Sequence, residues 1–300
     1  PPDNPHVSFL PHPAGAQGGP VVRALLDAKH FAVRALTRDV TKPSALALKD
    51  LGAEVVKCDL DDEASVVAAL KGVYGAFLVT NFWEYLNQER EVSQGKLMAD
   101  VAKRLGLKHV VFSSLEYIHK LSGGKLTVPH FDGKGIIEEY FRSIGVPMTS
   151  VRVPFYFENF HGGLKPAKAS DGDYYTLVLP MGDSPLPGIS VADIGVIVSN
   201  IFNSPEEFIG KAMNLGAEGL TLQQYAEILS KYLGKDIRDS KITPEAFEKL
   251  NIPQAKGIAN ACRYWGKNPE RDVELTYRLN PKVRRFQQFV SESVEALKNI

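Results

Sequence analysis

The chain has 300 residues, of which 44% are hydrophobic and 23% charged, so it can bury a substantial core in one or two domains. Its 35 Lys and Arg residues balance 35 Asp and Glu residues, which excludes the basic character typical of proteins that bind nucleic acid or an anionic membrane. Two cysteines, Cys58 and Cys262, are too few for a disulfide framework, and no apolar run has the length of a membrane span. With no basic-then-apolar signal pattern near residue 1, these features predict a soluble protein of the cytoplasm.

Apolar, strand-like runs alternate with helical patterns along the first half of the chain. Strands are expected at residues 7–10, 31–37, 53–58, 73–80, 109–113 and 148–152. Helices are expected from residue 21 onward and then at about 44–51, 63–70, 88–105 and 131–144, with Asp62 as the N-cap of the third. This alternation predicts an α/β fold with a Rossmann-type doubly wound parallel sheet.

Beyond Pro154 the pattern loosens, because glycines and prolines interrupt it. A strand is expected at 174–179, and helices are expected near 190–202, 221–233, 243–250, 253–264 and 283–297. We therefore expect a Rossmann domain over residues 1–153 and a smaller, mostly helical C-terminal lobe over 154–300. Segments at about 187–235 are expected to pack back on the first domain.

A glycine-rich turn connects the first expected strand to the first helix, and consists of Ala14, Gly15, Ala16, Gln17, Gly18 and Gly19. Glycines let the backbone approach phosphate oxygens, and the helix N-terminus supplies N–H groups and a partial positive charge. A three-glycine fingerprint at this spacing would have glycine at position 12, where the chain has His12 between Pro11 and Pro13. The turn alone therefore leaves two interpretations open, a cofactor loop and an ordinary strand-to-helix turn.

Arg38 follows the second expected strand, where a dinucleotide fold places the adenosine ribose. An acidic residue at this place binds the 2′-hydroxyl of NAD, whereas an arginine suits the 2′-phosphate of NADP, to which its planar fork donates two hydrogen bonds. Lys42 could add a second positive charge. The combination favours NADP(H), against the alternative of a solvated surface arginine.

Polar residues also follow the next three expected strands. Asp59 is placed to accept a hydrogen bond from an adenine amino group, and Thr80 and Asn81 are placed to flank the ribose or nicotinamide. The pair Ser113-Ser114 could supply a hydroxyl that polarises a substrate. For each of them, an ordinary turn or cap residue remains the alternative.

The segment His130-Phe131-Asp132-Gly133-Lys134, together with the strand order and Ser113-Ser114, resembles the atypical short-chain dehydrogenases/reductases. In the standard members, a tyrosine four residues before the lysine is the proton donor, and the charge of the lysine lowers its pKa. This chain has His130 in that position. An imidazole can relay a proton in principle, but a surface residue at a helix entry is the simpler interpretation.

Longer strings make the resemblance closer and extend it over nearly the whole chain. The strings AGAQGG, LTRDVTK, LVTNFWE, QGKLMADVAKRLGLKHVVFSSLE, HFDGKG, EEYFRSIGVPMTSVR and YFEN are similar to those of the NmrA-like family. Among its members, the sequence resembles most closely a vertebrate NADP(H)-binding redox sensor that has no established dehydrogenase activity. The region before residue 14 departs from the family pattern, which has glycines where His12 and Pro13 stand, so binding of the pyrophosphate is in question.

The resemblance implies a set of cofactor contacts but no catalytic residue and no metal site. Residues Ala14 to Gly19 would hold the pyrophosphate, Arg38 and Lys42 the 2′-phosphate, Asp59 and Leu60 the adenine, and Thr80, Asn81 and Phe82 the ribose and nicotinamide side. Lys134 would bind the nicotinamide ribose, and Tyr156, Phe157, Glu158 and Asn159 would close over the nicotinamide.

Three functions follow as hypotheses. The first is an NADPH/NADP+ sensor, for which the resemblance implies a homodimer, argininosuccinate synthetase and NF-κB pathway proteins as partners, and a cytoplasmic, perinuclear and nuclear location. The second is an NADPH-dependent reductase of small quinones or enones that uses Lys134, as relatives of the isoflavone reductase group retain the lysine without the tyrosine. The third, suggested by His12 and Pro13, is an interaction protein without a cofactor.

Overall fold

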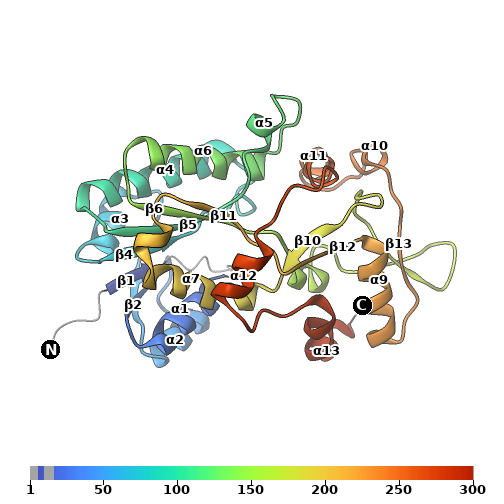
Figure 1. Ribbon diagram of the computed structural model, residues 1–300, viewed down its shortest axis with the longest axis horizontal. Coiled ribbons are helices and arrows are strands. Elements are labelled where there is room, and N and C mark those ends of the chain that lie inside the picture. The colour runs from blue at the N-terminus through green and yellow to red at the C-terminus, as the bar shows by residue number, and fades with distance from the viewer. Residues whose placement is uncertain (1–5, 10–16, 300) are drawn as a thin grey trace. The chain divides into compact units, whose positions relative to one another are not determined.

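The computed structural model describes the backbone of residues 6–9 and all of residues 17–299 (Figure 1). The chain forms two compact units, and each is assembled from separate stretches of sequence. The first contains the residues up to Tyr117, His130–Arg152 and Val191–Met213, and the second contains Ile118–Pro129, Val153–Ser190 and Asn214–Ile300. The expected boundary at residue 153 is thus one of several, because a short excursion at 118–129 and a return at 191–213 exchange chain between the units.

A seven-stranded sheet, in the order β11-β6-β5-β4-β1-β2-β3, forms the centre of the first unit. Its strands are β1 (His6–Phe9), β2 (Ala32–Thr37), β3 (Glu54–Lys57), β4 (Gly75–Leu78), β5 (His109–Ser114), β6 (Met148–Arg152) and β11 (Ala212–Asn214). Strands β1 to β6 pair in parallel, and the order runs outward in opposite directions from β1 and β4. This is the doubly wound order of a Rossmann fold, so the predicted fold class is confirmed.

Helices cover both faces of this sheet (Figure 1). One face carries α3 (Glu63–Leu70), α4 (Gln88–Leu105) and α6 (Pro129–Ser143), and the other carries α1 (Gly18–Ala28), α2 (Pro43–Asp50) and α7 (Ile194–Asn203), which is followed by α8 (Pro205–Phe208). A 3₁₀ turn, η2 (Val191–Asp193), precedes α7. Within the described part of the chain, no helix has both the length and the apolar character needed to cross a membrane.

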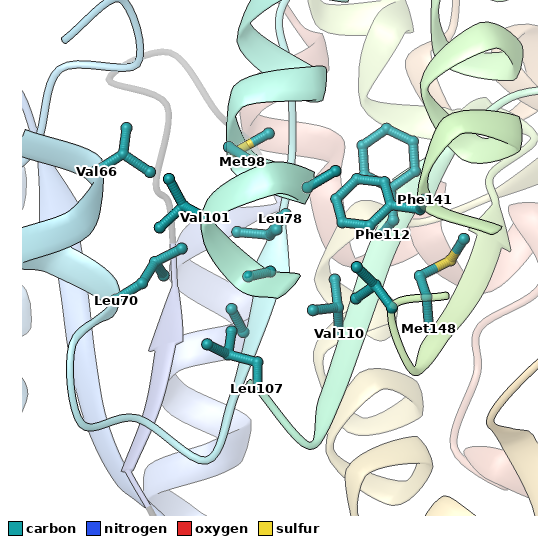
Figure 2. Close-up of a cluster of buried hydrophobic side chains, with 14 of the residues drawn as sticks. Val66, Leu70, Leu78, Met98, Val101, Leu107, Val110, Phe112, Phe141 and Met148 are labelled. Atoms are coloured by element: carbon teal, nitrogen blue, oxygen red, sulfur yellow. The ribbon is translucent and has the colours of Figure 1, made fainter. Parts of the chain in front are cut away.

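A cluster of buried apolar side chains fills the core between the sheet and α3, α4 and α6 (Figure 2). Phe112 of β5 and Phe141 of α6 lie with ring centroids 5.6 Å apart, and Leu78 and Met98 are fully buried beside them. Both faces of β4 and β5 are buried, which explains the apolar sequence of β4 and the central Val-Val-Phe of β5. Each fully buried side chain of this size contributes roughly 1.5–3 kcal/mol to stability.

Capping residues mark the ends of α3 and α4. Asp62 accepts a hydrogen bond from the N–H of Ala64 and caps α3, as predicted. Asn87 caps α4 by accepting from the N–H of Arg90, and α4 ends at Gly106, whose φ of 66° favours glycine. These local signals account for the close agreement between the predicted helix at 88–105 and α4.

The second unit is mostly helical, as predicted, but it also contains two three-stranded sheets. Its strands are β7 (Phe155–Tyr156), β8 (Ala167–Lys168), β9 (Tyr175–Leu177), β10 (Leu186–Ile189), β12 (Glu218–Leu220) and β13 (Ile237–Asp239). Its helices are α5 (Ile118–Leu121), η1 (Phe157–His161), α9 (Leu222–Leu233), α10 (Pro244–Phe247), α11 (Ala255–Trp265), α12 (Val273–Leu279) and α13 (Phe286–Leu297). The rings of Phe157, Phe160, Tyr225, Phe286 and Phe289 form an aromatic cluster inside this unit.

Candidate functional site

The carboxyl edge of the seven-stranded sheet gathers most of the predicted site residues of the first unit. Parallel strands end together, so Arg38 after β2, Asp59 after β3, and Thr80 and Asn81 after β4 all lie along one edge. The strand order reverses between β1 and β4, and folds of this kind bind ligands in the crevice outside such a reversal. The sheet therefore places these residues where a ligand site is expected.

Helix α1 begins at Gly18, directly after Gln17. Its first turn contains no acidic residue, and no side chain caps it at Gln17. The first N–H groups of a helix have no partner within the helix, so this terminus can receive an anion. The predicted contacts at Ala14, Gly15 and Ala16, and the departure at His12 and Pro13, lie outside the described residues.

Arg38 does not extend freely from the end of β2. Its Nη1 atom lies 2.5 Å from the carboxylate of Glu84 and donates to the hydroxyl of Tyr85 at 2.9 Å. Burial acts to lower the pKa of the Arg38 guanidinium, but the hydrogen bond to Glu84 and its negative charge outweigh this effect, and the pKa is raised. Lys42, the second predicted cation, lies exposed at the start of α2.

Tyr85 contacts two arginines. Arg38 donates to its hydroxyl, and the guanidinium of Arg90 lies 3.4 Å from the centre of its ring, a cation–π contact. Arg90 also pairs with Asp61 at 2.5 Å, and this hydrogen bond lowers the pKa of the Asp61 carboxyl. Arg38, which follows β2, and Arg90 of α4 thus both hold the loop between β4 and α4.

Asp59 and Leu60 have mainly local roles in the structure. The carboxylate of Asp59 accepts from the N–H of Asp61 at 2.9 Å, and its own N–H donates to Ser65 at 2.9 Å. Leu60 packs partly buried against the apolar core. The contacts of Asp59 are therefore those of a turn residue. A contact of Asp59 or Leu60 with the adenine stays a prediction.

Lys134 on α6 reaches back to the end of β4. Its ammonium donates to the carbonyl of Thr80 at 2.6 Å, to the Thr80 hydroxyl at 3.0 Å and to the carboxylate of Glu91 at 2.8 Å. The side chain of Glu91 is 1% exposed, and that of Lys134 is 13% exposed. Three acceptors thus match the three N–H bonds of the ammonium, and Glu91 neutralises its charge.

His130 lies one turn before Lys134, and it is buried, so its interpretation as a surface residue is wrong. Its ring packs against those of Phe82, Trp83 and Phe131 at centroid distances of 5.0–5.9 Å. Burial and the nearby charge of Lys134 lower the pKa of His130 to about 4. The imidazole is therefore neutral at physiological pH and part of an aromatic contact to which Phe82 also belongs.

Ser114, one of the two candidate hydroxyls, points into a buried network. It donates to the carboxylate of Glu138 at 2.8 Å, which also receives two hydrogen bonds from Arg152. Glu138 is buried, yet the hydrogen bonds and charges around it lower its pKa. Ser113 is buried as well. These contacts favour structural roles over substrate polarisation.

The predicted residues Tyr156 to Asn159 belong to the second unit, which is described by itself. Phe157 is fully buried and packs on Phe286 with ring centroids 5.0 Å apart, so its ring belongs to the core of that unit rather than to an exposed lid. Glu158 accepts from Ser190 at 2.5 Å. Burial and the charge of Glu158 raise the pKa of Tyr156. Nicotinamide contacts by these residues stay predictions.

Comparison with known proteins identifies the family of this chain. The family model described as "NmrA-like family" matches residues 12–288. This chain belongs to the NmrA-like family. An NmrA-like family domain-containing protein of Dictyostelium discoideum is 35% identical over 78% of this chain and 80% of that protein. An NmrA-like family domain-containing oxidoreductase of Cladobotryum, FrzB, is 30% identical over 81% of this chain and 79% of that protein.

Solved structures related to this NmrA-like protein show the same fold. NmrA, a negative transcriptional regulator, in complex with NADP has a TM-score of 0.82 at 23% identity, over 97% of this chain and 95% of NmrA. The NADPH-dependent quinone oxidoreductase QOR2 of Escherichia coli, complexed with NADPH, has a TM-score of 0.78 at 22% identity, over 98% and 100%. At these identities the likeness establishes the fold.

The residues of the site that could not be named from the sequence include Asp61, Glu84, Tyr85, Arg90 and Glu91. Glu91 carried a usable signal, because with Gln94, Met98 and Val101 it lies on the buried stripe of α4, where a carboxylate needs a partner. Glu84 and Tyr85 carried no such signal. Their roles depend on contact with Arg38, which lies 46 and 47 positions earlier in the sequence.

Proposed function

We propose that this NmrA-like protein binds NADP(H) at the carboxyl edge of the seven-stranded sheet in the first unit. The observation that carries the proposal is the position of Arg38, at the end of β2 in a doubly wound sheet. An arginine at this place suits the 2′-phosphate that distinguishes NADP from NAD. The relatives of the same fold that are complexed with NADP and NADPH support the assignment.

The donor set of the described residues fits this cofactor. Arg38 and Lys42 supply positive charge beside the second strand, and α1 presents an N-terminus whose first turn has no acidic residue to repel a pyrophosphate. Thr80 and Asn81 follow β4 at the strand-order reversal, where they would flank the ribose and nicotinamide. When bound, the cofactor would supply a transferable hydride. Because Glu84 pairs with Arg38, binding of the 2′-phosphate must compete with this ion pair.

Two observations favour a sensor over an enzyme. The three N–H bonds of the Lys134 ammonium match three acceptors, so a bond to a ribose hydroxyl requires one of these contacts to break. His130 is neutral and enclosed by aromatic rings at the position of the missing tyrosine. At the position of the missing tyrosine, the described part of the chain thus offers no exposed proton donor that a charged lysine could activate.

A sensor also requires that the cofactor bind two conformations with different affinities, because only such a difference shifts their populations. The loop between β4 and α4, residues 79–87, is the element through which occupancy would act, since Arg38 holds it through Glu84 and Tyr85. Changes in this loop would alter binding of regulatory protein partners, among which we propose a second copy of the chain. Hydrogen exchange of residues 79–87 should change when NADPH is added, and an unchanged pattern at saturation would contradict the sensor.

The second candidate is an NADPH-dependent reductase of quinones or enones. It is favoured by relatives named oxidoreductases and by the fold shared with a quinone oxidoreductase. In this reading, Lys134 would leave Glu91 and deliver a proton to the reduced substrate. The positive charge of Lys134 would then stabilise the transition state, whereas in the resting protein Glu91 neutralises it.

Oxidation of NADPH in the presence of a panel of quinones and enones separates the two candidates. The sensor predicts no turnover above the background rate for the wild-type protein. Turnover that Lys134→Ala abolishes while the affinity for NADPH is unchanged would reject the sensor and support the reductase. Glu91→Gln is the companion variant, because it keeps Lys134 and removes the charge that neutralises it. A reductase should respond to this substitution with an altered pH profile of turnover.

A further inference from the structure

The ion pair between Arg38 and Glu84 places an anion of the protein on the guanidinium that the proposed function assigns to the cofactor. The Glu84 carboxylate lies 2.5 Å from Nη1 of Arg38, and the Tyr85 hydroxyl accepts from the same nitrogen at 2.9 Å. A terminal guanidinium nitrogen carries two N–H bonds. These two acceptors match both of them.

A phosphate binds an arginine best through two parallel N–H bonds. A phosphate oxygen that takes a bond from Nη1 must therefore displace Glu84 or Tyr85, and if the carboxylate remains nearby it repels the incoming charge. A single Glu84 side chain thus has two effects of the same sign on the 2′-phosphate. The repulsion does not apply to a 2′-hydroxyl, because this group is uncharged.

The surrounding charges strengthen this conclusion. The guanidinium of Arg90 lies over the ring of Tyr85, but Asp61 pairs with it at 2.5 Å. Two arginines and two carboxylates form this cluster, so its net charge is zero rather than positive. Removal of the Glu84 charge alone would leave a cluster of net charge +1 beside the proposed 2′-phosphate.

We propose that Glu84 is a selectivity residue, which competes with the 2′-phosphate for Arg38 and so lowers the affinity for NADPH relative to NADH. This inference rests on the proposed binding of NADP(H) at Arg38. Competition by an internal carboxylate sets the NADPH concentration at which the site fills, without any change in the residues that contact the cofactor. It also makes the entry of the 2′-phosphate conditional on the release of residue 84 from Arg38.

The test is the substitution Glu84→Gln, which keeps the size of the side chain and removes its charge. NADPH and NADH are titrated by calorimetry into the wild-type protein, Glu84→Gln and the control Glu89→Gln. Glu89 is an exposed carboxylate in the first turn of α4, so the control makes the same change in net charge. Thermal melting of each variant verifies that it is folded.

For Glu84→Gln we expect the affinity for NADPH to rise by about three- to tenfold, as for the loss of a partly exposed ion pair and of a like charge near the phosphate. The affinity for NADH should change by less than about twofold, and Glu89→Gln should behave as the wild type. Added salt should reduce the gain, because it screens the charge.

An unchanged or weakened affinity for NADPH in Glu84→Gln would overturn the competition, and so would an equal gain in Glu89→Gln. An equal gain for NADH and NADPH would overturn the selectivity. In each of these cases wild-type binding of NADPH leaves the proposed function intact. If the wild-type protein binds no NADPH at ~1 mM, weaker than roughly −4 kcal/mol, the proposed function fails and the inference fails with it.

Discussion

His130 stands where a proton donor would stand in a working reductase of this fold, and its surroundings keep it uncharged. The ring is 8% exposed and lies among Phe82, Trp83 and Phe131. A charged imidazole would lose its hydration there, and the ammonium of Lys134 adds repulsion, so the pKa falls to about 4. The aromatic contact therefore excludes the protonated form from the folded protein over the physiological range.

This burial predicts a loss of stability in acid. The pKa of His130 is about 4 in the folded protein against an ordinary value of 6.5, so between these pH values the unfolded chain binds the proton and the folded protein does not. Stability is fully present above pH 6.5 and falls as the pH decreases towards 4, by about 3 kcal/mol for this group. His109, also lowered to about 4 by burial, contributes in the same direction.

Urea unfolding of the wild-type protein and of His130→Phe, measured at several pH values between 7 and 4, tests this prediction. The variant keeps an aromatic ring but cannot take up a proton, so its free energy of unfolding should fall less steeply, by about one proton per molecule. Parallel pH profiles for the two proteins would contradict the assignment of a depressed pKa to His130.

At the residue scale, sequence predicted the positions of the site better than their partners. Arg38, Thr80 and Lys134 all lie where the pattern of strands and helices indicated. Their contacts with Glu84 and Glu91 could not be predicted, because they join β2 to the loop after β4, and α6 to α4. A strand end can be read from local periodicity, whereas a charge partner some 40 residues away depends on the packing of whole elements.

At the element scale, segments with a full pattern were predicted almost to the residue, and several short ones were missed. Helix α4 and strand β6 have the expected bounds, because each carries a full pattern with clear ends. Strands β7, β8 and β11 have two or three residues, too few to show alternation. They exist because they pair with a neighbour: Lys211 beside β11, for example, accepts from the N–H of Ser150 in β6 at 2.9 Å.

The close approach of α4 and α6 depends on Gly95. A methyl group added at this position would lie 2.4 Å from atoms of Ile137, closer than van der Waals contact allows. Gly95→Ala should therefore destabilise the protein by about 1–3 kcal/mol through overpacking, although alanine favours a helix over glycine. Urea unfolding measures the change, and Gly95→Ala with Ile137→Ala should recover part of the loss relative to Ile137→Ala alone. A stabilised single variant would show that the two helices can move apart at no cost.

At the scale of the molecule, the two units divide the predicted site. The carboxyl edge of the first unit holds Arg38, Asn81 and Lys134, whereas Tyr156 to Asn159 belong to the second unit. The alternation of strands and helices was enough to predict the doubly wound sheet. A return to the first unit was expected over about 187–235, but in the structure only residues 191–213 belong to that unit. The sequence could not give these narrower bounds, because they depend on strand β11 pairing at the sheet edge beside β6.

The proposed binding of NADP(H) depends on recognition of the 2′-phosphate by Arg38. Calorimetric titration of NADPH and NADH into the wild-type protein and Arg38→Ala measures it most directly. We predict that the substitution weakens NADPH binding by roughly 1.5–3 kcal/mol, the range for a hydrogen bond to a charged group, and weakens NADH binding much less. Equal losses for the two cofactors, or no binding of NADPH to the wild-type protein, would contradict the account.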